Sequence, residues 1–162
     1  MKRIPLTQGK EALVSDQDYK YLMRWKWCFA KQTRGRGLGG YAVSRGSRPH
    51  RICLWMHRLV AARKGITGQV DHKDQNKLNN QRNNLRAATR SQNGANCGKQ
   101  QNNTTGFKGV CWSKWAQKWQ ASIGVSGKVI HLGYWNSAIA AACAYNRAAH
   151  KYFGPYAVFN KV

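Results

Sequence analysis

The apolar positions of this chain form short runs near the N-terminus and then change spacing. Runs at 4–6 and 12–14 predict two short strands. Apolar positions within 19–23 recur at spacings of three and four and follow Asp16 and Asp18, which predicts a helix with acidic residues in its first turn. The helix dipole favours negative charge at that end, so these acids are expected to have a structural role.

The next part of the chain alternates between glycine-rich and apolar sequence. Residues 34–40 are too rich in glycine for a regular element and predict an exposed loop. Residues 41–45 and 51–60 are apolar and aromatic, and they predict two strands. On this interpretation His57 is a structural residue of the second strand.

Polar residues then dominate a long segment between two apolar anchors. Val70 ends an extended run, and Leu85 resumes extended structure after a polar loop at 73–83. Thr89 and the glutamine three residues after it fit the capping-box pattern, which predicts that a helix begins there. Asn93 then lies in the first turn or so of that helix.

The C-terminal third has the pattern of a sheet followed by a helix. Residues 107–112, 119–123 and 129–135 predict strands, and the middle one alternates strictly between apolar and polar positions. Ser137 is a favourable N-cap for an alanine-rich helix that runs to about residue 152.

The predicted fold class is therefore α+β, in two small folded segments. Residues 1–100 form the first, 101–106 are a polar linker, and 107–160 form the second. An apolar content of 42%, with seven Trp and seven Tyr, argues against a disordered chain.

Charge limits the partners of the protein. There are 28 Lys and Arg against 5 Asp and Glu, a formal net charge of +23, and residues 101–162 contain no acidic residue. Most of these cations cannot be neutralised internally, which predicts a polyanionic partner. Charge alone leaves open a basic protein that only coats RNA or DNA.

Other classes of protein are disfavoured. The five cysteines have neither zinc-site spacing nor a nearby histidine cluster, so buried free thiols are expected and zinc is not. The N-terminus lacks the apolar core of a signal peptide, and no apolar run is long enough to span a membrane. We therefore expect a soluble protein of the cytoplasm, without a membrane partner.

Candidate chemistry is concentrated in one segment. After Asp18 the only acidic residues are Asp71 and Asp74, and His72 follows Asp71 directly. One carboxylate and one amide, from Asp71 and Asn93, suit a hard divalent cation such as Mg²⁺ and leave positions for water and phosphate oxygens. His72 can accept a proton from water near neutral pH. Adjacent strand residues point to opposite faces, so these side chains share a site only if the strand bends or ends there.

The order of these motifs carries a resemblance. The motifs are His57-Arg58-Leu59-Val60, Val70-Asp71-His72-Lys73-Asp74, Leu78-Asn79-Asn80 and the run from Asn84-Leu85-Arg86 to Thr89-Arg90-Ser91-Gln92-Asn93. Together they resemble the HNH endonucleases of phage and intron homing type.

That resemblance implies a ββα-metal fold with its core motif at 57–99. It implies that Asp71 and Asn93 bind the metal, Mg²⁺ or Mn²⁺, and that His72 is the general base. Asn84, the second residue assigned to the catalytic set, would tie the hairpin together by hydrogen bonds. Asn93 stands where many relatives have His, a departure shared by a homing subgroup.

A second resemblance covers the C-terminal segment. Its motifs are Phe107-Lys108-Gly109-Val110, Lys118-Trp119-Gln120-Ala121-Ser122-Ile123, Leu132-Gly133-Tyr134-Trp135, Ala141 to Ala149, Phe153-Gly154, Ala157 and Asn160. This segment resembles the AP2 DNA-binding domain, which implies a three-stranded antiparallel sheet laid in the major groove with a helix behind it. Several arginines that plant-type domains direct at bases have no counterpart here, so the target sequence cannot be carried over.

The implied contacts to double-stranded DNA follow from the alternation of the strands and from basic residues near both motifs. Trp112 and Trp115 either stack on sugars or pack at the sheet edge. The predicted DNA-binding residues are Arg86, Arg90, Lys108, Trp112, Lys114, Trp115, Lys118, Gln120, Ser122 and His131.

The leading hypothesis is a phage- or intron-encoded, metal-dependent DNA endonuclease acting in a bacterial host. One site per chain predicts a nick from a monomer, whereas a double-strand break needs a dimer or two events. The rival is a non-catalytic DNA-binding or regulatory protein that retains an HNH scaffold. A basic RNA-coating protein is a third and weaker reading.

Overall fold

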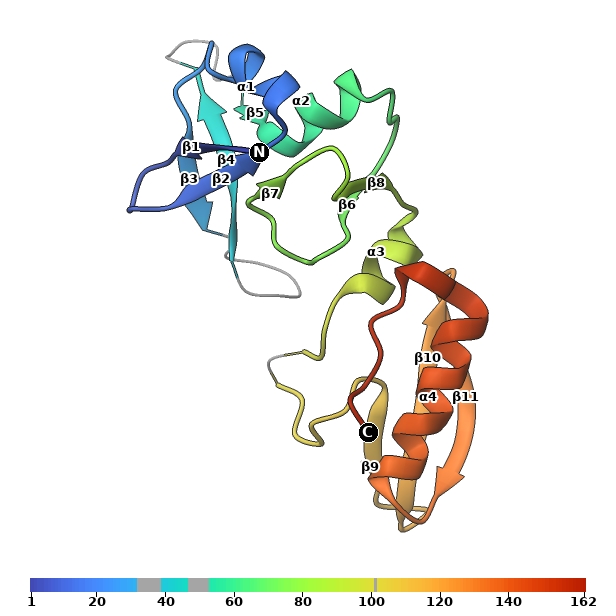
Figure 1. The fold of residues 1–162 in the computed structure, drawn as a ribbon. Coiled ribbons are helices and arrows are strands. Elements are labelled where there is room, and N and C mark those ends of the chain that lie inside the picture. The colour runs from blue at the N-terminus through green and yellow to red at the C-terminus, as the bar shows by residue number, and fades with distance from the viewer. Residues whose placement is uncertain (32–38, 47–52, 101) are drawn as a thin grey trace. The chain divides into compact units, whose positions relative to one another are not determined.

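The computed structural model describes residues 1–31, 39–46, 53–100 and 102–162. The chain folds as two compact units, Met1–Ala88 and Thr89–Val162 (Figure 1). Most of the loop predicted at 34–40 and the start of the strand predicted at 51–60 lie outside the described residues.

The first unit consists of short strands and two helices. In chain order its elements are β1 (Lys2–Pro5), β2 (Glu11–Val14), α1 (Asp16–Leu22), β3 (Cys28–Lys31), β4 (Gly40–Arg45), β5 (Cys53–Trp55), α2 (Met56–Arg63), β6 (Val70–His72), β7 (Asn79–Asn80) and β8 (Leu85–Ala87). The strands form the sheets β1-β2-β7, β3-β4-β5 and β6-β8. All pairs are antiparallel except β2 and β7.

One apolar cluster joins these small sheets. Its buried members come from both N-terminal strands, both helices, β4, β8 and the segments that follow β1 and α1: Ile4, Leu6, Ala12, Val14, Leu22, Trp27, Ala42, Met56, Val60 and Leu85. Burial of that apolar surface is the main force that holds such short strands in place.

The acidic start of α1 has the predicted structural role. Asp18 is fully buried and accepts hydrogen bonds from Arg82 at 2.7 and 2.9 Å and from Arg63 at 3.1 Å. The hydrogen bond from Arg82 lowers the pKa of Asp18 and outweighs the opposing effect of burial. Asp18 thereby connects α1 to α2 and to the segment that precedes β8.

The strand predicted at 51–60 is wrong over most of its described length. Only β5 is extended, and α2 begins at Met56, so His57 is a helix residue. Met56 and Val60 are fully buried, one helical turn apart, and this spacing fits a helix better than a strand.

The second unit begins with α3 and contains the predicted sheet and helix. Its elements are α3 (Arg90–Asn96), β9 (Val110–Ser113), β10 (Lys118–Val125), β11 (Lys128–Trp135), α4 (Ala138–Phe153) and the 3-10 turn η1 (Gly154–Tyr156). The three strands pair antiparallel in the order β9-β10-β11, and α4 covers one face of that sheet (Figure 1).

Alternation along β10 is as predicted. Ala121 and Ile123 are buried against the residues of α4, whereas Gln120 and Ser122 are only partly covered. The helix starts at the predicted cap, where the Ser137 hydroxyl accepts a hydrogen bond from the Ala140 amide at 3.1 Å.

The boundary between the compact units differs from the predicted linker at 101–106. The division falls between Ala88 and Thr89, so α3 belongs to the C-terminal unit. Ala95 of α3 lies in one apolar cluster with Ile123 and Phe153, which explains the difference. The assignment of 1–100 and 107–160 to separate functions stays a prediction.

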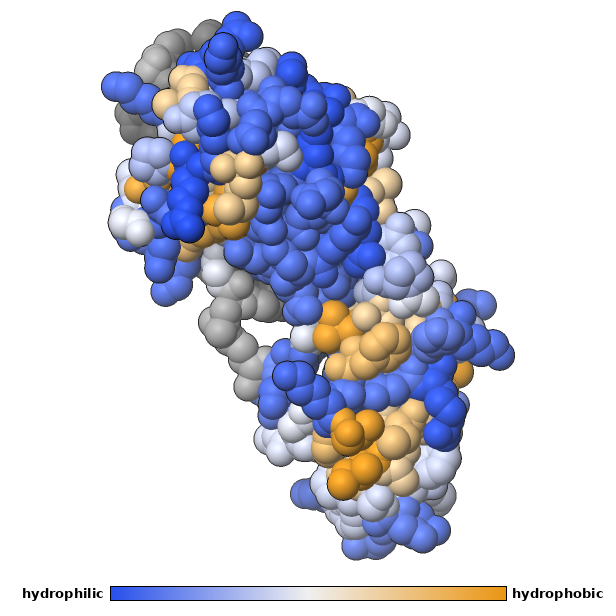
Figure 2. Space-filling model, viewed as in Figure 1, coloured by the Kyte–Doolittle hydropathy of each residue, from blue (hydrophilic) through white to orange (hydrophobic). Residues whose placement is uncertain are grey.

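The surface reflects the composition of the chain. In the space-filling view the first unit is largely hydrophilic, whereas the second shows hydrophobic patches (Figure 2). Within the four described ranges no helix has the length and apolar character to cross a membrane. The cysteines are free thiols, but Cys53 and Cys111 are exposed and the other three are only half-buried, so the expectation of buried thiols is wrong.

Candidate active site

Asp71 and His72 lie at the end of β6, where the sequence requires the strand to stop. β6 ends at His72, and the His72 carbonyl accepts a hydrogen bond from the Gln75 amide at 2.9 Å. Gln75 has a φ of 63° and reverses the chain. Both Asp71 and His72 are 6% exposed, so a carboxylate and an imidazole are largely withdrawn from water at adjacent positions.

The imidazole of His72 is oriented by Asn80. His72 Nε2 lies 3.2 Å from Asn80 Oδ1. The Asn80 amide nitrogen donates to the Leu78 carbonyl at 3.3 Å and to Met56 Sδ at 3.4 Å, which turns its oxygen toward the ring. Nε2 therefore carries the proton, and Nδ1 is the basic nitrogen of the neutral ring.

The same surroundings keep His72 neutral. Burial lowers its pKa below the ordinary value, although the hydrogen bond with Asn80 and the charges of Asp74 and Asp71 act in the opposite direction. A general base must be unprotonated before it can accept a proton. His72 meets that condition at neutral pH.

An aromatic cluster surrounds His72 on the side of β4 and α2. The His57 ring lies 5.4 Å from the His72 ring and 5.1 Å from the Tyr41 ring, centroid to centroid. Trp55 lies 5.2 Å from Tyr41. Burial, followed by the charges of His72 and Arg58, lowers the pKa of His57 to about 3. Two neutral imidazoles therefore lie together.

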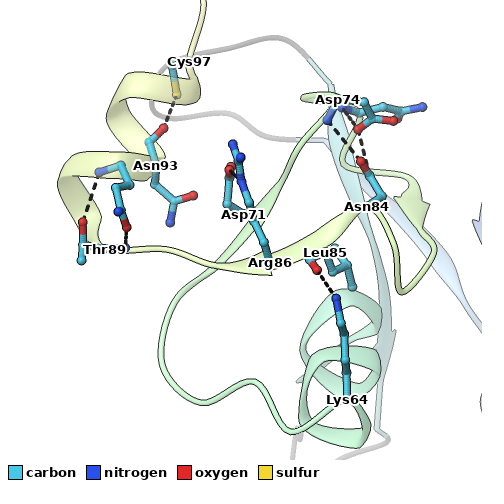
Figure 3. Close-up of polar contacts among 11 residues, drawn as sticks. Lys64, Asp71, Asp74, Asn84, Leu85, Arg86, Thr89, Asn93 and Cys97 are labelled. Carbon is cyan, nitrogen blue, oxygen red and sulfur yellow. Dashed lines mark hydrogen bonds and ion pairs between the residues drawn. The ribbon is translucent and has the colours of Figure 1, made fainter. Parts of the chain in front are cut away.

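Asp71 has a basic partner on the neighbouring strand. Residues Asp71 and Arg86 are opposite each other in the β6-β8 register, and Arg86 Nε donates to Asp71 Oδ2 at 2.8 Å (Figure 3). Their side chains are 8% and 14% exposed. The structure thus gives Arg86 a buried partner within the chain, and its predicted contact with DNA stays a prediction.

Asn84 ties the loop between the hairpin strands, as the resemblance implies. Its amide nitrogen donates to Asp74 Oδ1 at 2.9 Å and to the Asn79 carbonyl at 2.8 Å, and its oxygen accepts from the Asp74 amide at 3.2 Å (Figure 3). The second carboxylate oxygen of Asp74 accepts from the Asn79 side chain at 2.7 Å. Asn84 and Asp74 therefore act on the shape of the loop.

Asn93 lies on α3, and the predicted capping box starts that helix. The Gln92 amide donates to Thr89 Oγ1 at 3.2 Å, and the Thr89 amide donates to Gln92 Oε1 at 2.8 Å (Figure 3). Asp71, His72 and Asn84 thus belong to the first unit, with Asp71 and His72 on β6 and Asn84 in the turn before β8, whereas Asn93 belongs to the second unit.

Comparison with known proteins identifies the family. Residues 54–95, which include each of these motif residues, match the HNH endonuclease family. Over 156 residues the chain is 31% identical to a protein of Acanthamoeba polyphaga mimivirus named "Uncharacterized HNH endonuclease L560", a match that covers 96% of this chain and 77% of that protein. The chain belongs to the HNH endonuclease family.

A second viral relative matches a shorter stretch. A segment of 59 residues is 39% identical to Protein 3.8 of Escherichia phage T7 and covers 36% of this chain. The match spans about half of that relative, 49% of its length. No solved structure matches this HNH chain.

Two further residues of the first unit were not given a role at the site by the sequence analysis. Asn80 was quoted within a motif without a role, and His57 was assigned to a strand. The four-residue spacing of Met56 and Val60 is the signal that places His57 on a helix. Nothing in the local pattern indicates that Asn80 and His57 meet His72.

Most of the predicted DNA contacts in the second unit lie at the surface. Trp115 is 88% exposed, and Trp112 is 45% exposed while its ring contacts Trp119 edge to face at 5.2 Å. His131 lies 4.7 Å from Tyr134, centroid to centroid. The other exposed predicted contacts are Arg90, Lys114 and Lys118.

Lys108 is the exception among these residues. Its ammonium group donates to three backbone carbonyls of the same unit, those of Gly94, Ala95 and Cys97. An ammonium group has three hydrogens, and these carbonyls accept them in this structure. The contact of Lys108 with DNA stays a prediction.

Proposed function

We propose that this HNH protein is a metal-dependent DNA endonuclease that nicks duplex DNA, with His72 as its general base. The observation that carries the proposal is a neutral, buried imidazole whose Nε2 is fixed by Asn80, next to the carboxylate of Asp71. Metal-assisted hydrolysis of a phosphodiester uses a positioned general base together with groups that hold the metal.

The donors present fit a divalent cation. Asp71 offers a carboxylate and Asn93 an amide oxygen, both hard donors of the kind that Mg²⁺ and Mn²⁺ bind. The described residues contain no group of three or more His, Cys, Asp and Glu side chains close enough to share a metal. When bound, the cation supplies a Lewis acid for the charge that develops on the phosphate.

The chemical step follows from the orientation of His72. Nδ1 accepts a proton from the attacking water, whose oxygen forms a bond to phosphorus. The bond from phosphorus to the 3′-oxygen breaks, and the leaving oxygen takes a proton from solvent. The products are a 5′-phosphate and a 3′-hydroxyl, as the HNH resemblance implies.

The second unit supplies most of the affinity for DNA in this proposal. Residues 101–162 carry seven basic and no acidic residues, and exposed Trp, Lys and His side chains lie on or beside the β9-β10-β11 sheet. An interface that neutralises several phosphates weakens steeply as salt rises. We propose that this sheet contacts the duplex in the manner of an AP2 domain.

One observation favours the rival function. The ion pair between Asp71 and Arg86 engages the carboxylate that the metal needs. A protein that keeps the HNH scaffold only to bind DNA can retain such a pair without loss.

Plasmid nicking separates the two functions. Purified protein is incubated at low salt with supercoiled plasmid that carries a candidate host site, in Mg²⁺, Mn²⁺ or EDTA. Wild type runs beside His72→Ala and a matched control, His150→Ala, which changes an exposed histidine of α4. Nicked circles that require metal and His72 but not His150 establish the nuclease. Binding without nicking on a verified target supports the rival.

A further inference from the structure

The helix that carries Asn93 is too short to be stable by itself. α3 has seven residues, and isolated helices of this length are marginal in water. The last carbonyls of any helix lack partners within it. The position of Asn93 therefore depends on what satisfies both ends of α3.

Lys108 satisfies the carboxyl end. Its Nζ lies 2.6 Å from the Ala95 carbonyl, 2.5 Å from the Cys97 carbonyl and 3.3 Å from the Gly94 carbonyl. The positive charge also lies at the end of the helix where the dipole favours a cation. A single side chain thus replaces the missing helical donors.

The backbone of Lys108 is itself fixed to α4. Asn160 accepts from the Lys108 amide at 2.6 Å and donates to the Lys108 carbonyl at 3.1 Å. The side chain of Asn146 on α4 holds the backbone of Asn160 in turn. Its oxygen accepts from the Asn160 amide at 2.7 Å, and its nitrogen donates to the Asn160 carbonyl at 2.9 Å. The Val158 amide adds a further bond to the Ala95 carbonyl at 3.2 Å.

We propose that Lys108 is a positioning residue for the metal ligand Asn93. The chain of contacts from Asn146 through Asn160 to Lys108 fixes α3 against the unit that carries the DNA-binding sheet. The proposal rests on the proposed function, in which Asn93 binds the metal. It means that contacts within the second unit determine how Asn93, one of the proposed metal ligands, is held on α3.

Two measurements on the full chain test this role. Hydrogen exchange reports the opening of α3, and titration with Mn²⁺ alone, followed by the EPR signal of free Mn²⁺, reports metal affinity. The variants are Lys108→Met, Asn93→Ala, which removes the proposed ligand, and Lys128→Met, which removes an equal charge from an exposed position of β11. DNA affinity is measured for each.

The proposal predicts a specific set of results. In Lys108→Met the amides of α3 exchange at least roughly tenfold faster, whereas the amides of α4 keep their protection. Mn²⁺ affinity falls about 10- to 100-fold, the range found when a residue that orients a metal ligand is lost. DNA affinity falls no further than in Lys128→Met.

Other results overturn the proposal. Unchanged exchange in α3 shows that Lys108 does not hold the helix, and faster exchange with wild-type Mn²⁺ affinity shows that it does not position the ligand. A loss of DNA affinity without a change in Mn²⁺ binding assigns Lys108 to the DNA contact predicted from sequence.

A second lysine variant and the Asn93→Ala result cover the remaining outcomes. If Lys108→Met also removes the protection of α4, Lys108→Gln, which keeps an amide donor near the carbonyls, is judged by the same outcomes. If Asn93→Ala binds Mn²⁺ like wild type, the metal assignment of the proposed function fails. In that case, faster exchange of α3 in Lys108→Met still shows that Lys108 holds the helix, whereas unchanged exchange shows that it does not.

Discussion

Replacement of Asp18 by Asn is expected to destabilise the N-terminal unit strongly, although the change is a single atom for another. Asp18 is fully buried and is the only carboxylate that both Arg63 and Arg82 contact in the described ranges. In Asp18→Asn the two guanidinium groups keep their charge and lose the anion that balances it. Arg82 is next to the loop that ends at Asn84, so the damage extends toward the site.

The magnitude follows from burial. Removal of one partner of a buried ion pair costs about 3–5 kcal/mol. Arg63 and Arg82 are 39% and 24% exposed, so both can turn partly toward water, which places the cost near the lower end, about 3 kcal/mol. For a unit of this size that corresponds to a fall in Tm of more than roughly 10 °C.

Native-state hydrogen exchange on the full chain measures this cost. Amides of β1 and β2 should exchange roughly 100-fold faster in Asp18→Asn, whereas amides of α4 provide an internal reference in the other unit. Asp16→Asn is the matched control, because Asp16 lies in the same helical turn but is 65% exposed and pairs with the N-terminus. An equal effect of the two variants, or an effect of Asp18→Asn below about 1 kcal/mol, would refute the reasoning.

Three further predictions concern the site and the second unit. Asn80→Leu keeps the volume but removes the acceptor that fixes His72 Nε2, so the nicking rate should fall roughly tenfold or more with DNA affinity unchanged. His57 has a pKa of about 3 when folded and 6.5 when unfolded, so the unfolded chain binds more protons below pH 6.5. Stability should therefore fall by roughly 1 kcal/mol per pH unit as the pH drops from about 6 to 4.5, measured by urea unfolding, and His57→Phe should flatten that slope. Gly109 has a φ of 73°, and a Cβ there would overlap the Tyr145 ring, so Gly109→Ala should destabilise α4 by about 3 kcal/mol in hydrogen exchange.

Each of these predictions can fail in a recognisable way. Wild-type nicking by Asn80→Leu would show that the orientation of His72 is set elsewhere. An equal pH slope in His57→Phe would mean that His57 titrates near its ordinary value. Wild-type protection of α4 in Gly109→Ala would show that the turn can adapt to a side chain.

Sequence patterns predicted correctly those elements that depend on residues close together in the chain. The capping box at Thr89, the alternation along β10 and the end of β6 at His72 each depend on residues within one or two turns of each other. They appear in the structure where the sequence places them. The resemblance to HNH endonucleases added roles, and the family is confirmed.

The features that the sequence did not indicate have a different physical origin. The roles of Arg86 and Lys108 depend on partners that the fold brings near: Asp71 across a hairpin, and the carbonyls of α3. In a chain of net charge +23, a basic residue is easily interpreted as a DNA contact. The neighbouring sequence does not show that another part of the chain accepts its hydrogen bonds. The helix at Met56 was missed because aromatic and apolar residues around it also favour a strand.

The pH dependence of nicking tests the central claim, that His72 is a neutral general base. Single-turnover rates are measured with Mn²⁺ for wild type and His72→Ala from about pH 5 to 8. Burial lowers the pKa of His72, so the wild-type rate should rise with pH through a midpoint below 6.5 and then level off. His72→Ala should lack that rise and be roughly 100-fold slower or more on the plateau. A variant that keeps both the wild-type rate and its pH profile would contradict the account.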